Sequence, residues 1–240
     1  MRLSVIIPAY NEAKRITSTL ISIRDYLSKQ SYDWEVLIVS DGSKDNTVEV
    51  VNKFTSENKE FRLTDNKKNN GKGYVVRQGV LSAKGDYRLF TDADNSTAIN
   101  HLDKFWPYFN QGYGVVIASI AVKGATLANS EKFYKRWFGK FGNLWIQLWL
   151  LPGIWDSRRG FKMFTKKAAE DIFSKVIESG WTFDDEALAI ARKLKYKIKE
   201  VPIHWINDPE SKVKLRDYPQ TLLEVLRIKI NFLRGVYNNK

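Results

Sequence analysis

Residues 87–95 read Tyr-Arg-Leu-Phe-Thr-Asp-Ala-Asp-Asn, and this stretch decides how the rest of the chain is interpreted. Its first half has the apolar character of a short buried strand, and Asp92, Ala93 and Asp94 follow where that strand ends. Two carboxylates around one small residue suit Mg²⁺ or Mn²⁺, which take oxygen ligands from one or two carboxylates and fill the remaining positions with water and phosphate oxygens. Such pairs are also common in turns and helix caps, so the interpretation depends on the surrounding sequence.

Upstream of this stretch, short apolar runs alternate with amphipathic segments. The predicted strands cover residues 3–7, 34–39 and 61–63, the first of them stopped by Pro8, and a helix is predicted from about residue 72 to residue 83. Strands that alternate with helices in this way indicate βαβ units. We therefore expect an α/β fold with a mostly parallel central sheet and helices on both faces.

Polar residues fall at the predicted carboxyl ends of several strands: residues 8–12, Asp41 and residues 92–94. Ligands of open parallel sheets bind at these ends, so the convergence predicts one nucleotide site. The absence of G-x-G-x-x-G after the first strand argues against a classical dinucleotide fold. Residues 69–73, Asn-Asn-Gly-Lys-Gly, open the helix that carries Arg77, and a helix start with a lysine favours an anion.

Downstream, strands are predicted at residues 115–118, within 156–164 and at 198–203, with helices at about 166–178 and 184–194. Residues 130–155 combine lysine, arginine and many aromatic side chains, but this apolar run is too short and interrupted to span a bilayer. A helical stripe of leucine and isoleucine follows Tyr218. From the residues alone, both segments can cover the core or lie on a membrane surface, and the second can also form a dimer contact.

Composition excludes several classes of site. The 240 residues include no cysteine, so disulfides, thiol nucleophiles and thiolate ligands are excluded, and only two histidines, His101 and His204, argue against a histidine zinc site. A net charge of +12 favours polyanionic partners such as nucleic acid, anionic lipid or phosphorylated substrates, although a lysine-rich solvated surface explains it equally well. The N-terminal apolar run is too short for a signal peptide, so a cytoplasmic protein is the default expectation.

Seven motifs occur in an order that resembles inverting family-2 glycosyltransferases of the GT-A fold. They lie at residues 5–12 (VIIPAYNE), 40–47 (SDGSKDNT), 69–73 with Arg77, 91–95 (TDADN), 156–162 (D-x-x-x-G-F-K), 181–186 (W-x-F-D-x-E) and 205–212 (W-x-x-x-x-x-S-K). The likeness is greatest to dolichyl-phosphate β-glucosyltransferases and their polyprenyl-phosphate relatives. It implies one GT-A domain over residues 1–240, with a nucleotide-sugar half (1–97), an acceptor half (98–217) and a C-terminal amphipathic helix (218–240).

The resemblance also implies site residues and substrates. The implied donor is UDP-glucose, with GDP-mannose used in sister groups, and Asp92 and Asp94 are the implied ligands of Mg²⁺ or Mn²⁺. The implied catalytic residues are Asp92, Asp94 and Asp184. The implied donor-binding residues are Pro8, Tyr10, Glu12, Asp41, Lys72, Arg77, Asp92, Ala93, Asp94, Trp181, Glu186, Ser211 and Lys212.

A polyprenyl (dolichyl or undecaprenyl) phosphate is the expected acceptor of the hexose. A phosphate monoester is already mostly dianionic near neutrality and needs cations to hold it, whereas an alcohol acceptor needs a base such as Asp184. The chain departs from the family pattern at Ser40 and Asn95 and, on the acceptor side, at Ile120 and Glu131. Either the cations that hold the acceptor phosphate are Lys135, Arg136, Arg158 and Arg159, or the acceptor differs.

Relatives often carry a transmembrane anchor, and this sequence shows no such segment. We therefore expect peripheral attachment to the cytoplasmic face of an anionic membrane through residues 130–155 and the C-terminal helix. The alternatives are a family-2 transferase with a hydroxyl acceptor, a nucleotidyltransferase and a nucleic-acid-binding protein. A nucleotidyltransferase is disfavoured because this sequence lacks the glycine-rich segment that usually follows the first strand of such enzymes. Nucleic-acid binding leaves the acids at the strand ends without a purpose, so no nucleic-acid partner is expected.

Overall fold

The structure is a computed structural model that describes residues 2–128, 133–206 and 217–238, without the side chains of residues 133–138, 217 and 218. In chain order, the elements up to the Asp-Ala-Asp segment are β1 (Leu3–Ala9), α1 (Ile16–Leu27), β2 (Trp34–Asp41), α2 (Thr47–Glu57), β3 (Phe61–Asn66), α3 (Lys72–Ser82) and β4 (Tyr87–Thr91). They are followed by η1 (Ile99–Lys104), α4 (Trp106–Asn110), β5 (Val115–Ser119), β6 (Thr126–Ala128), α5 (Phe133–Trp149) and β7 (Phe161–Thr165). The chain then forms α6 (Lys166–Phe173), α7 (Phe183–Lys193), β8 (Ile198–Pro202), β9 (His204–Ile206) and α8 (Asp217–Leu233).

Seven strands form the central sheet in the order β3-β2-β1-β4-β7-β5-β8, and β6 and β9 form a small separate sheet. The pairs among β3, β2, β1 and β4 are parallel, as is the pair β5–β8. Strand β7 runs antiparallel to both of its neighbours, β4 and β5. The expected α/β fold with a mostly parallel sheet is therefore confirmed, with one reversed strand at its middle.

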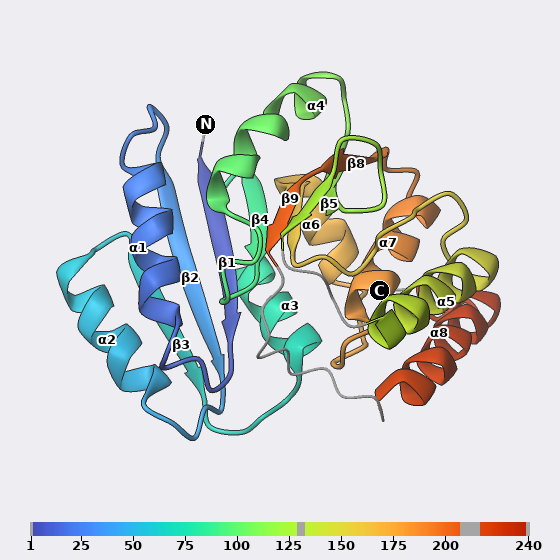
Figure 1. The fold of residues 1–240 in the computed structure, drawn as a ribbon, viewed down its shortest axis with the longest axis horizontal. Coiled ribbons are helices and arrows are strands. Elements are labelled where there is room, and N and C mark those ends of the chain that lie inside the picture. Colours follow the sequence, from blue (N-terminus) through green and yellow to red (C-terminus); the bar gives the residue numbers. More distant parts are fainter. Residues whose placement is uncertain (1, 129–132, 207–216, 239–240) are drawn as a thin grey trace.

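Two hydrophobic cores lie on opposite faces of the sheet (Figure 1). One joins the sheet to α1, α2, η1 and α4, and the other joins it to α3, α6 and α7. Alternation along β1 shows how the sequence produces both, because Val5 and Ile7 enter the first core and Ile6 enters the second. Each strand residue thus covers one face, as the two-residue period of a strand requires.

Several predicted boundaries are wrong, and β2 and β3 extend past the predicted ends at residues 39 and 63 to Asp41 and Asn66. The first strand does not stop at Pro8 but continues to Ala9, where Pro8 and Ala9 pair with Val39 and Ser40 of β2. On its other side, β1 pairs with β4 only as far as Ile6, so the proline stands where the sheet is open on one side. The helix predicted to end at residue 178 ends at Phe173, because the amides of residues 177 and 178 donate to the buried carboxylate of Glu186 and not to helix carbonyls.

Helices α5 and α8 pack side by side at one edge of the molecule, next to α7 (Figure 1). The indole Nε1 of Trp145 donates to the carbonyl of Leu222 at 3.3 Å across this contact. Large apolar side chains remain exposed on both helices, including Leu144 and Leu148 on α5 and Leu223 on α8. Among the described residues, no helix has the length and apolar character needed to cross a membrane.

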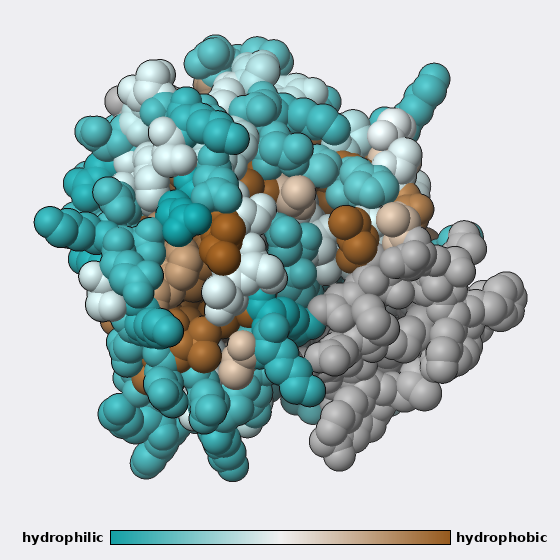
Figure 2. Space-filling model, turned by 60° about the vertical axis from the view of Figure 1, so that its left-hand side comes forward, coloured by the Kyte–Doolittle hydropathy of each residue, from teal (hydrophilic) through white to brown (hydrophobic). Residues whose placement is uncertain are grey.

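Figure 2 brings forward the side of the molecule that carries α1 and α2. Hydrophilic residues cover most of it, and hydrophobic residues gather in smaller patches near its centre. This is the ordinary balance of a folded α/β domain, whose surface always retains some apolar area. The concentration of apolar side chains along α5 and α8 is therefore the feature that needs a functional explanation.

Candidate active site

The Asp-Ala-Asp segment follows directly after β4 and is held from two sides. From α1, Thr19 Oγ1 donates to the carbonyl oxygen of Ala93 at 2.7 Å. From the segment before β7, the carbonyl oxygen of Gly160 accepts the amide of Asp92 at 3.0 Å. The amide of Ser96 donates to Asp94 Oδ1 at 2.9 Å. Both carboxylates are thus placed by backbone contacts at the carboxyl end of a central strand.

Asn95 explains one departure from the family pattern. Its φ of 54° lies in the left-handed region, which glycine adopts without steric cost and which asparagine tolerates better than most residues. The turn after Asp94 therefore requires a residue that tolerates a positive φ, and asparagine is such a residue.

Four charged side chains form an alternating cluster that we call the Lys–Asp cluster: Lys72, Asp92, Lys162 and Asp184. Lys72 Nζ lies 2.6 Å from Asp92 Oδ1, and Lys162 Nζ lies 2.7 Å from Asp184 Oδ1. Both ammonium groups face the ring of Phe90, at 5.3 and 5.5 Å from its centroid. Residues from α3, β4, β7 and α7 thereby meet at one place.

The electrostatics of the cluster follow from burial and mutual contact. Burial acts to lower the pKa of Lys72, but the carboxylates of Asp92, Asp184 and Asp94 more than offset it, so the pKa is raised and the ammonium stays protonated. Burial also raises the pKa of Asp184, against the opposing effect of Lys162 and Lys72. The site therefore holds several charges that are costly to bury and that stabilise one another.

The donor set of Asp92 and Asp94 fits a divalent cation. Burial, followed by the negative charge of Asp92, raises the pKa of the Asp94 carboxyl, which shows two acids that repel each other at close range. A divalent cation would relieve this repulsion. The described residues contain no group of three or more acidic or histidine side chains suited to a metal ion. Mg²⁺ is usually held by one or two carboxylates and completes its coordination with water and phosphate oxygens, which is the contribution that Asp92 and Asp94 can make.

Asp41, at the end of β2, orders the loop that precedes α3. Its two carboxylate oxygens accept the amides of Asn70 at 2.7 Å and Gly71 at 3.0 Å. Gly71 has a φ of 98°, and a Cβ there would lie 2.3 Å from the carbonyl oxygen of Ser179. Asp41 therefore positions the loop that delivers Lys72, and its predicted direct contact with the donor stays a prediction.

The residues after β1 lie beside the same strand ends. The Glu12 carboxylate pairs with Arg15, whose Nη2 donates to Glu12 Oε1 at 3.0 Å, and the Glu12 amide donates to Thr47 Oγ1 at 2.7 Å. Pro8 and Tyr10 are half-buried there. Ser211 and Lys212, two further predicted donor contacts, lie outside the described residues.

Trp181 lies next to the Lys–Asp cluster, whereas Glu186 is buried and forms its hydrogen bonds with other residues. The Trp181 ring lies 5.4 Å from Lys72 Nζ. Glu186 is fully buried and accepts the amides of Ile177 and Glu178 through one oxygen and the Tyr237 hydroxyl, at 2.7 Å, through the other. Burial raises its pKa to about 6. Glu186 thus anchors the segment before Trp181, and its predicted donor contact stays a prediction.

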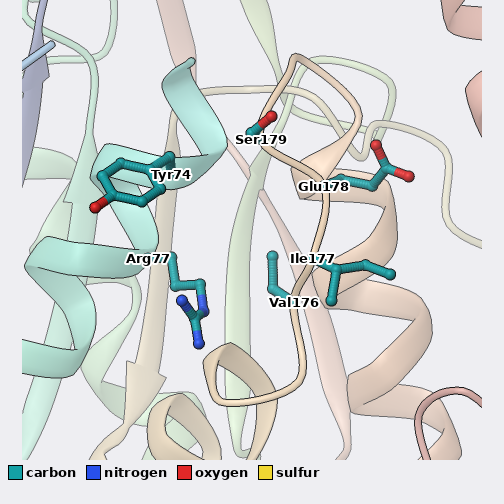
Figure 3. Close-up of a pocket in the computed structure, with 6 residues that line it drawn as sticks. All are labelled: Tyr74, Arg77, Val176, Ile177, Glu178 and Ser179. Atoms are coloured by element: carbon teal, nitrogen blue, oxygen red, sulfur yellow. The ribbon is translucent and has the colours of Figure 1, made fainter. Parts of the chain in front are cut away.

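Arg77 lies on another side of α3 from Lys72. Its Nε donates to the carbonyl of Phe173 at 2.8 Å, and its side chain lines a small hollow with Tyr74. Figure 3 shows both side chains extending from α3 opposite the segment of residues 176–179. The contacts of Arg77 therefore tie α3 to the end of α6, and a role in donor binding stays a prediction.

The two arginines predicted for the acceptor are held by acids. Arg158 donates to Asp185 Oδ2 at 2.7 and 3.0 Å, and Arg159 donates to Asp156 Oδ2 at 3.0 Å. The Arg159 guanidinium also lies 4.4 Å from the centroid of Trp205. Each arginine is roughly a quarter exposed, so part of each charge still faces solvent. The side chains of Lys135 and Arg136 lie outside the described part of α5.

Sequence reasoning missed Gly160 and Lys162. A Cβ on Gly160 would lie 1.9 Å from Asp92 Oδ2, so only glycine leaves room for this carboxylate. Lys162 is opposite Phe90 in the antiparallel register of β4 and β7, and this register brings its ammonium to Asp184. The motif at residues 156–162 contained both residues, but only the strand pairing shows what they contact.

Comparison with known proteins supports the resemblance to family-2 glycosyltransferases. The model of the family described as glycosyl transferase family 2 matches residues 4–173. Dolichyl-phosphate beta-glucosyltransferase of Trichomonas vaginalis is 33% identical over 98% of this chain and 73% of its own length. The proteins of that name from human and Saccharomyces cerevisiae are each 32% identical, over 98% and 99% of this chain and 77% of their own lengths.

Solved structures show the same fold. Glucosyl-3-phosphoglycerate synthase of Mycobacterium tuberculosis aligns with a TM-score of 0.69 at 14% identity, over 96% of this chain and 80% of that one. A mannosyltransferase from Pyrobaculum calidifontis, in complex with GDP-Man and Mn²⁺, aligns with a TM-score of 0.61 at 19% identity, over 100% of this chain and 65% of that one. The chain belongs to glycosyltransferase family 2, and it is a glycosyltransferase with the GT-A fold.

Proposed function

We propose that this glycosyltransferase transfers glucose from UDP-glucose to the phosphate of a polyprenyl phosphate, such as dolichyl or undecaprenyl phosphate, with inversion at the anomeric carbon. The observation that carries the proposal is the neighbourhood of Asp184. This carboxylate is buried with Lys162 at 2.7 Å and within the field of Lys72, so the site offers cations rather than a free base. The relatives named dolichyl-phosphate beta-glucosyltransferase support the same donor sugar and acceptor.

In the proposed reaction, an acceptor phosphate oxygen bonds to the anomeric carbon while the bond from that carbon to the diphosphate oxygen breaks, releasing UDP. The acceptor phosphate is mostly dianionic near neutrality, so no proton has to be removed. Asp92 and Asp94 would hold Mg²⁺ or Mn²⁺, which stabilises negative charge on the diphosphate. Lys72 provides a protein cation at the start of α3, where the helix end also favours an anion.

The acceptor phosphate is expected beside the segment of residues 156–161, which lies against Asp92 through Gly160. Arg158 and Arg159 belong to this segment and keep part of their charge towards solvent. Asp184 then orients Lys162 and Lys72 and does not need to take a proton. Lys135 and Arg136 remain proposed contributors from α5.

A matched pair of acceptors tests this function. Purified protein is given radiolabelled UDP-glucose, Mg²⁺ or Mn²⁺, and either a short polyprenyl phosphate or the corresponding polyprenol. We expect organic-extractable product only with the phosphate, loss of product with EDTA, and recovery when the metal is restored. Product with the polyprenol and not with the phosphate would overturn the proposed acceptor. Product with GDP-mannose and not with UDP-glucose would overturn the proposed donor.

Asp184 also allows an alternative, in which it acts as the base for a hydroxyl acceptor. Burial raises its pKa, and a carboxylate works best as a general base when its pKa lies near the operating pH. Asp184→Asn separates the two cases. With a phosphate acceptor we expect a loss of about tenfold or less, whereas general-base catalysis on an alcohol predicts a loss of roughly 10²–10⁴-fold. UDP affinity, measured by calorimetry on the same variant, shows whether the donor site remains intact.

We further propose that the α5/α8 edge rests on an anionic membrane, where a polyprenyl phosphate resides. The exposed fractions of Leu144, Leu148, Leu223 and Leu233 range from 64% to 78%, which is unusual for large apolar side chains that lie on adjacent helices. Lys140 on α5 and Arg234 after α8 are also exposed near this edge. An apolar face with basic neighbours suits the headgroup region of such a membrane.

Sedimentation with liposomes tests this attachment. We expect binding to vesicles containing phosphatidylserine at low salt and release as salt rises, because charge screening weakens the basic contribution. Replacing Leu144 and Leu148 by serine should abolish binding, whereas Leu81→Ser, on the exposed side of α3, should leave it unchanged. Absence of binding even at low salt would reject the membrane proposal without affecting the proposed reaction.

A further inference from the structure

We infer that Lys72 competes with the divalent cation for Asp92, so that metal binding depends on prior or simultaneous binding of the nucleotide. This inference rests on the proposed function, because it concerns the same donor site. The Lys72 ammonium lies 2.6 Å from Asp92 Oδ1, in direct contact with one of the two proposed metal ligands. A cation supplied by the protein thus already neutralises the carboxylate that a metal would use.

The charges of the site make this competition significant. With all groups ionised, the carboxylates of Asp92, Asp94 and Asp184 face the ammonium groups of Lys72 and Lys162, which leaves one net negative charge. Such a site attracts a divalent cation only modestly. A nucleoside diphosphate adds at least two negative charges and shifts the balance towards the metal. Without Lys72, the carboxylates alone would bind the metal more tightly.

Lys72 is free to change partners in a way that Lys162 is not. The Lys72 and Asp92 side chains are 19% and 31% exposed, whereas those of Lys162 and Asp184 are 1% and 5% exposed. The Lys72 ammonium also lies 5.3 Å from the centroid of the Phe90 ring and 5.4 Å from the centroid of the Trp181 ring, and both rings attract a cation whichever carboxylate or phosphate it pairs with. Its long flexible stem starts at the first residue of α3, beside the proposed diphosphate site.

The two states of Lys72 follow from these contacts. Without nucleotide, its ammonium pairs with Asp92 and weakens metal binding. With nucleotide, it turns to a diphosphate oxygen and releases Asp92 for the metal. Lys72 thus couples the two ligands, and by thermodynamic reciprocity the metal must strengthen nucleotide binding by the same factor.

Binding of Mn²⁺ alone, followed through the electron paramagnetic resonance signal of free Mn²⁺, tests the inference without any turnover. The wild-type protein is compared with Lys72→Met, Lys72→Gln and Lys72→Arg, each with no nucleotide and with saturating UDP. We expect UDP to strengthen Mn²⁺ binding strongly in the wild type. Lys72→Met and Lys72→Gln should bind Mn²⁺ roughly tenfold more tightly than wild type without UDP, as removal of a neighbouring charge predicts, and should gain less from UDP.

The controls separate local from general charge effects. Lys67→Met removes one positive charge from an 88% exposed side chain near the same loop and should leave Mn²⁺ binding unchanged. Lys72→Arg keeps the charge and should retain the wild-type dependence on UDP. Mn²⁺ binding that is unchanged or weaker in Lys72→Met and Lys72→Gln without UDP would overturn the inference. Failure of wild-type protein to bind Mn²⁺ even with UDP would instead overturn the proposed function, and the inference with it.

Discussion

Two lysine–aspartate pairs lie within one cluster, yet their surroundings differ. Lys72 and Asp92 contact each other at 2.6 Å with 19% and 31% of their side chains exposed. Lys162 and Asp184 contact each other at 2.7 Å with 1% and 5% exposed. The first pair joins the start of α3 to the end of β4, and the second joins β7 to α7. Nearly identical contacts therefore occur in a partly exposed and in a fully buried environment.

This difference decides what each pair can do. Separating the buried pair leaves an uncompensated charge in the interior, which costs far more than the contact itself contributes. Separating the partly exposed pair lets water or a ligand replace the lost partner at small cost. The buried pair can therefore fix the geometry of the site, while the open pair can exchange its partner for a phosphate or a metal during the reaction.

The largest expected effect comes from breaking the buried pair. Lys162→Met should lower the free energy of unfolding by roughly 3–5 kcal/mol, because Asp184 then remains buried without a cation. Lys72→Met should change it by at most about 1 kcal/mol, since Asp92 is partly solvated. Urea unfolding, followed by circular dichroism, measures both.

A double variant sharpens this comparison. Lys162→Met combined with Asp184→Leu removes both charges and should recover most of the stability lost in Lys162→Met. Equal costs for Lys162→Met and Lys72→Met would show that burial does not distinguish the two pairs.

A smaller effect is expected from a substitution that crowds Asp92, the carboxylate of the partly exposed pair. Gly160→Ala would place a methyl group 1.9 Å from Asp92 Oδ2, so this carboxylate has to rotate away. We expect kcat/KM for glucose transfer to fall by about 10²-fold, the usual cost of displacing a reacting group by about 1 Å. The matched control is Gly142→Ala in α5, where a Cβ meets no atom within 4 Å and activity should be retained. Full activity of Gly160→Ala would show that the position of Asp92 is not critical.

The smallest effect concerns Glu186, a buried carboxylate without a lysine partner. Burial raises its pKa from an ordinary value of 4.5 to about 6, so the folded protein holds this proton over a pH range in which the unfolded chain has lost it. The stability contributed by this proton is complete below about pH 4.5 and is lost as the pH rises through 6. Between pH 4 and 7, the unfolding free energy of Glu186→Gln should therefore gain roughly 2 kcal/mol relative to wild type.

A second variant checks the sign of this effect. The Tyr237 hydroxyl donates to Glu186 and acts to lower its pKa, so Tyr237→Phe should extend the pH dependence to higher pH. Equal pH dependence of stability in wild type and Glu186→Gln would contradict the assignment of a raised pKa to this group.

Much of the first half of the fold could be predicted from local sequence. The run before Asp92 is a strand because it is short, apolar and followed by turn residues, and the loop at residues 69–73 leads into a helix that begins at Lys72. Parallel pairing of β1, β2, β3 and β4 follows from their alternation with helices. These features depend on neighbours a few residues apart.

The second half could be predicted less well because its contacts are distant in sequence. Nothing in residues 156–164 shows that β7 inserts antiparallel between β4 and β5. Gly160 and Lys162 acquire their roles from that register, and so they were missed. The helix predicted to reach residue 178 stops early because the amides of Ile177 and Glu178 donate to the carboxylate of Glu186. The same carboxylate accepts the hydroxyl of Tyr237, which is still more distant in sequence.

By itself, the sequence determined which residues stand at strand ends, including Asp41, Asp92 and Asp94, because apolar runs and turn residues act over short distances. It also determined the family, since several short motifs in one order are together specific for it although each alone is weak. Tertiary structure decided which lysine faces which carboxylate and which pair stays dry. The physical reason is that the energy of a charge pair depends on separation and solvent exposure, and both are set by strand register and helix packing between distant parts of the chain.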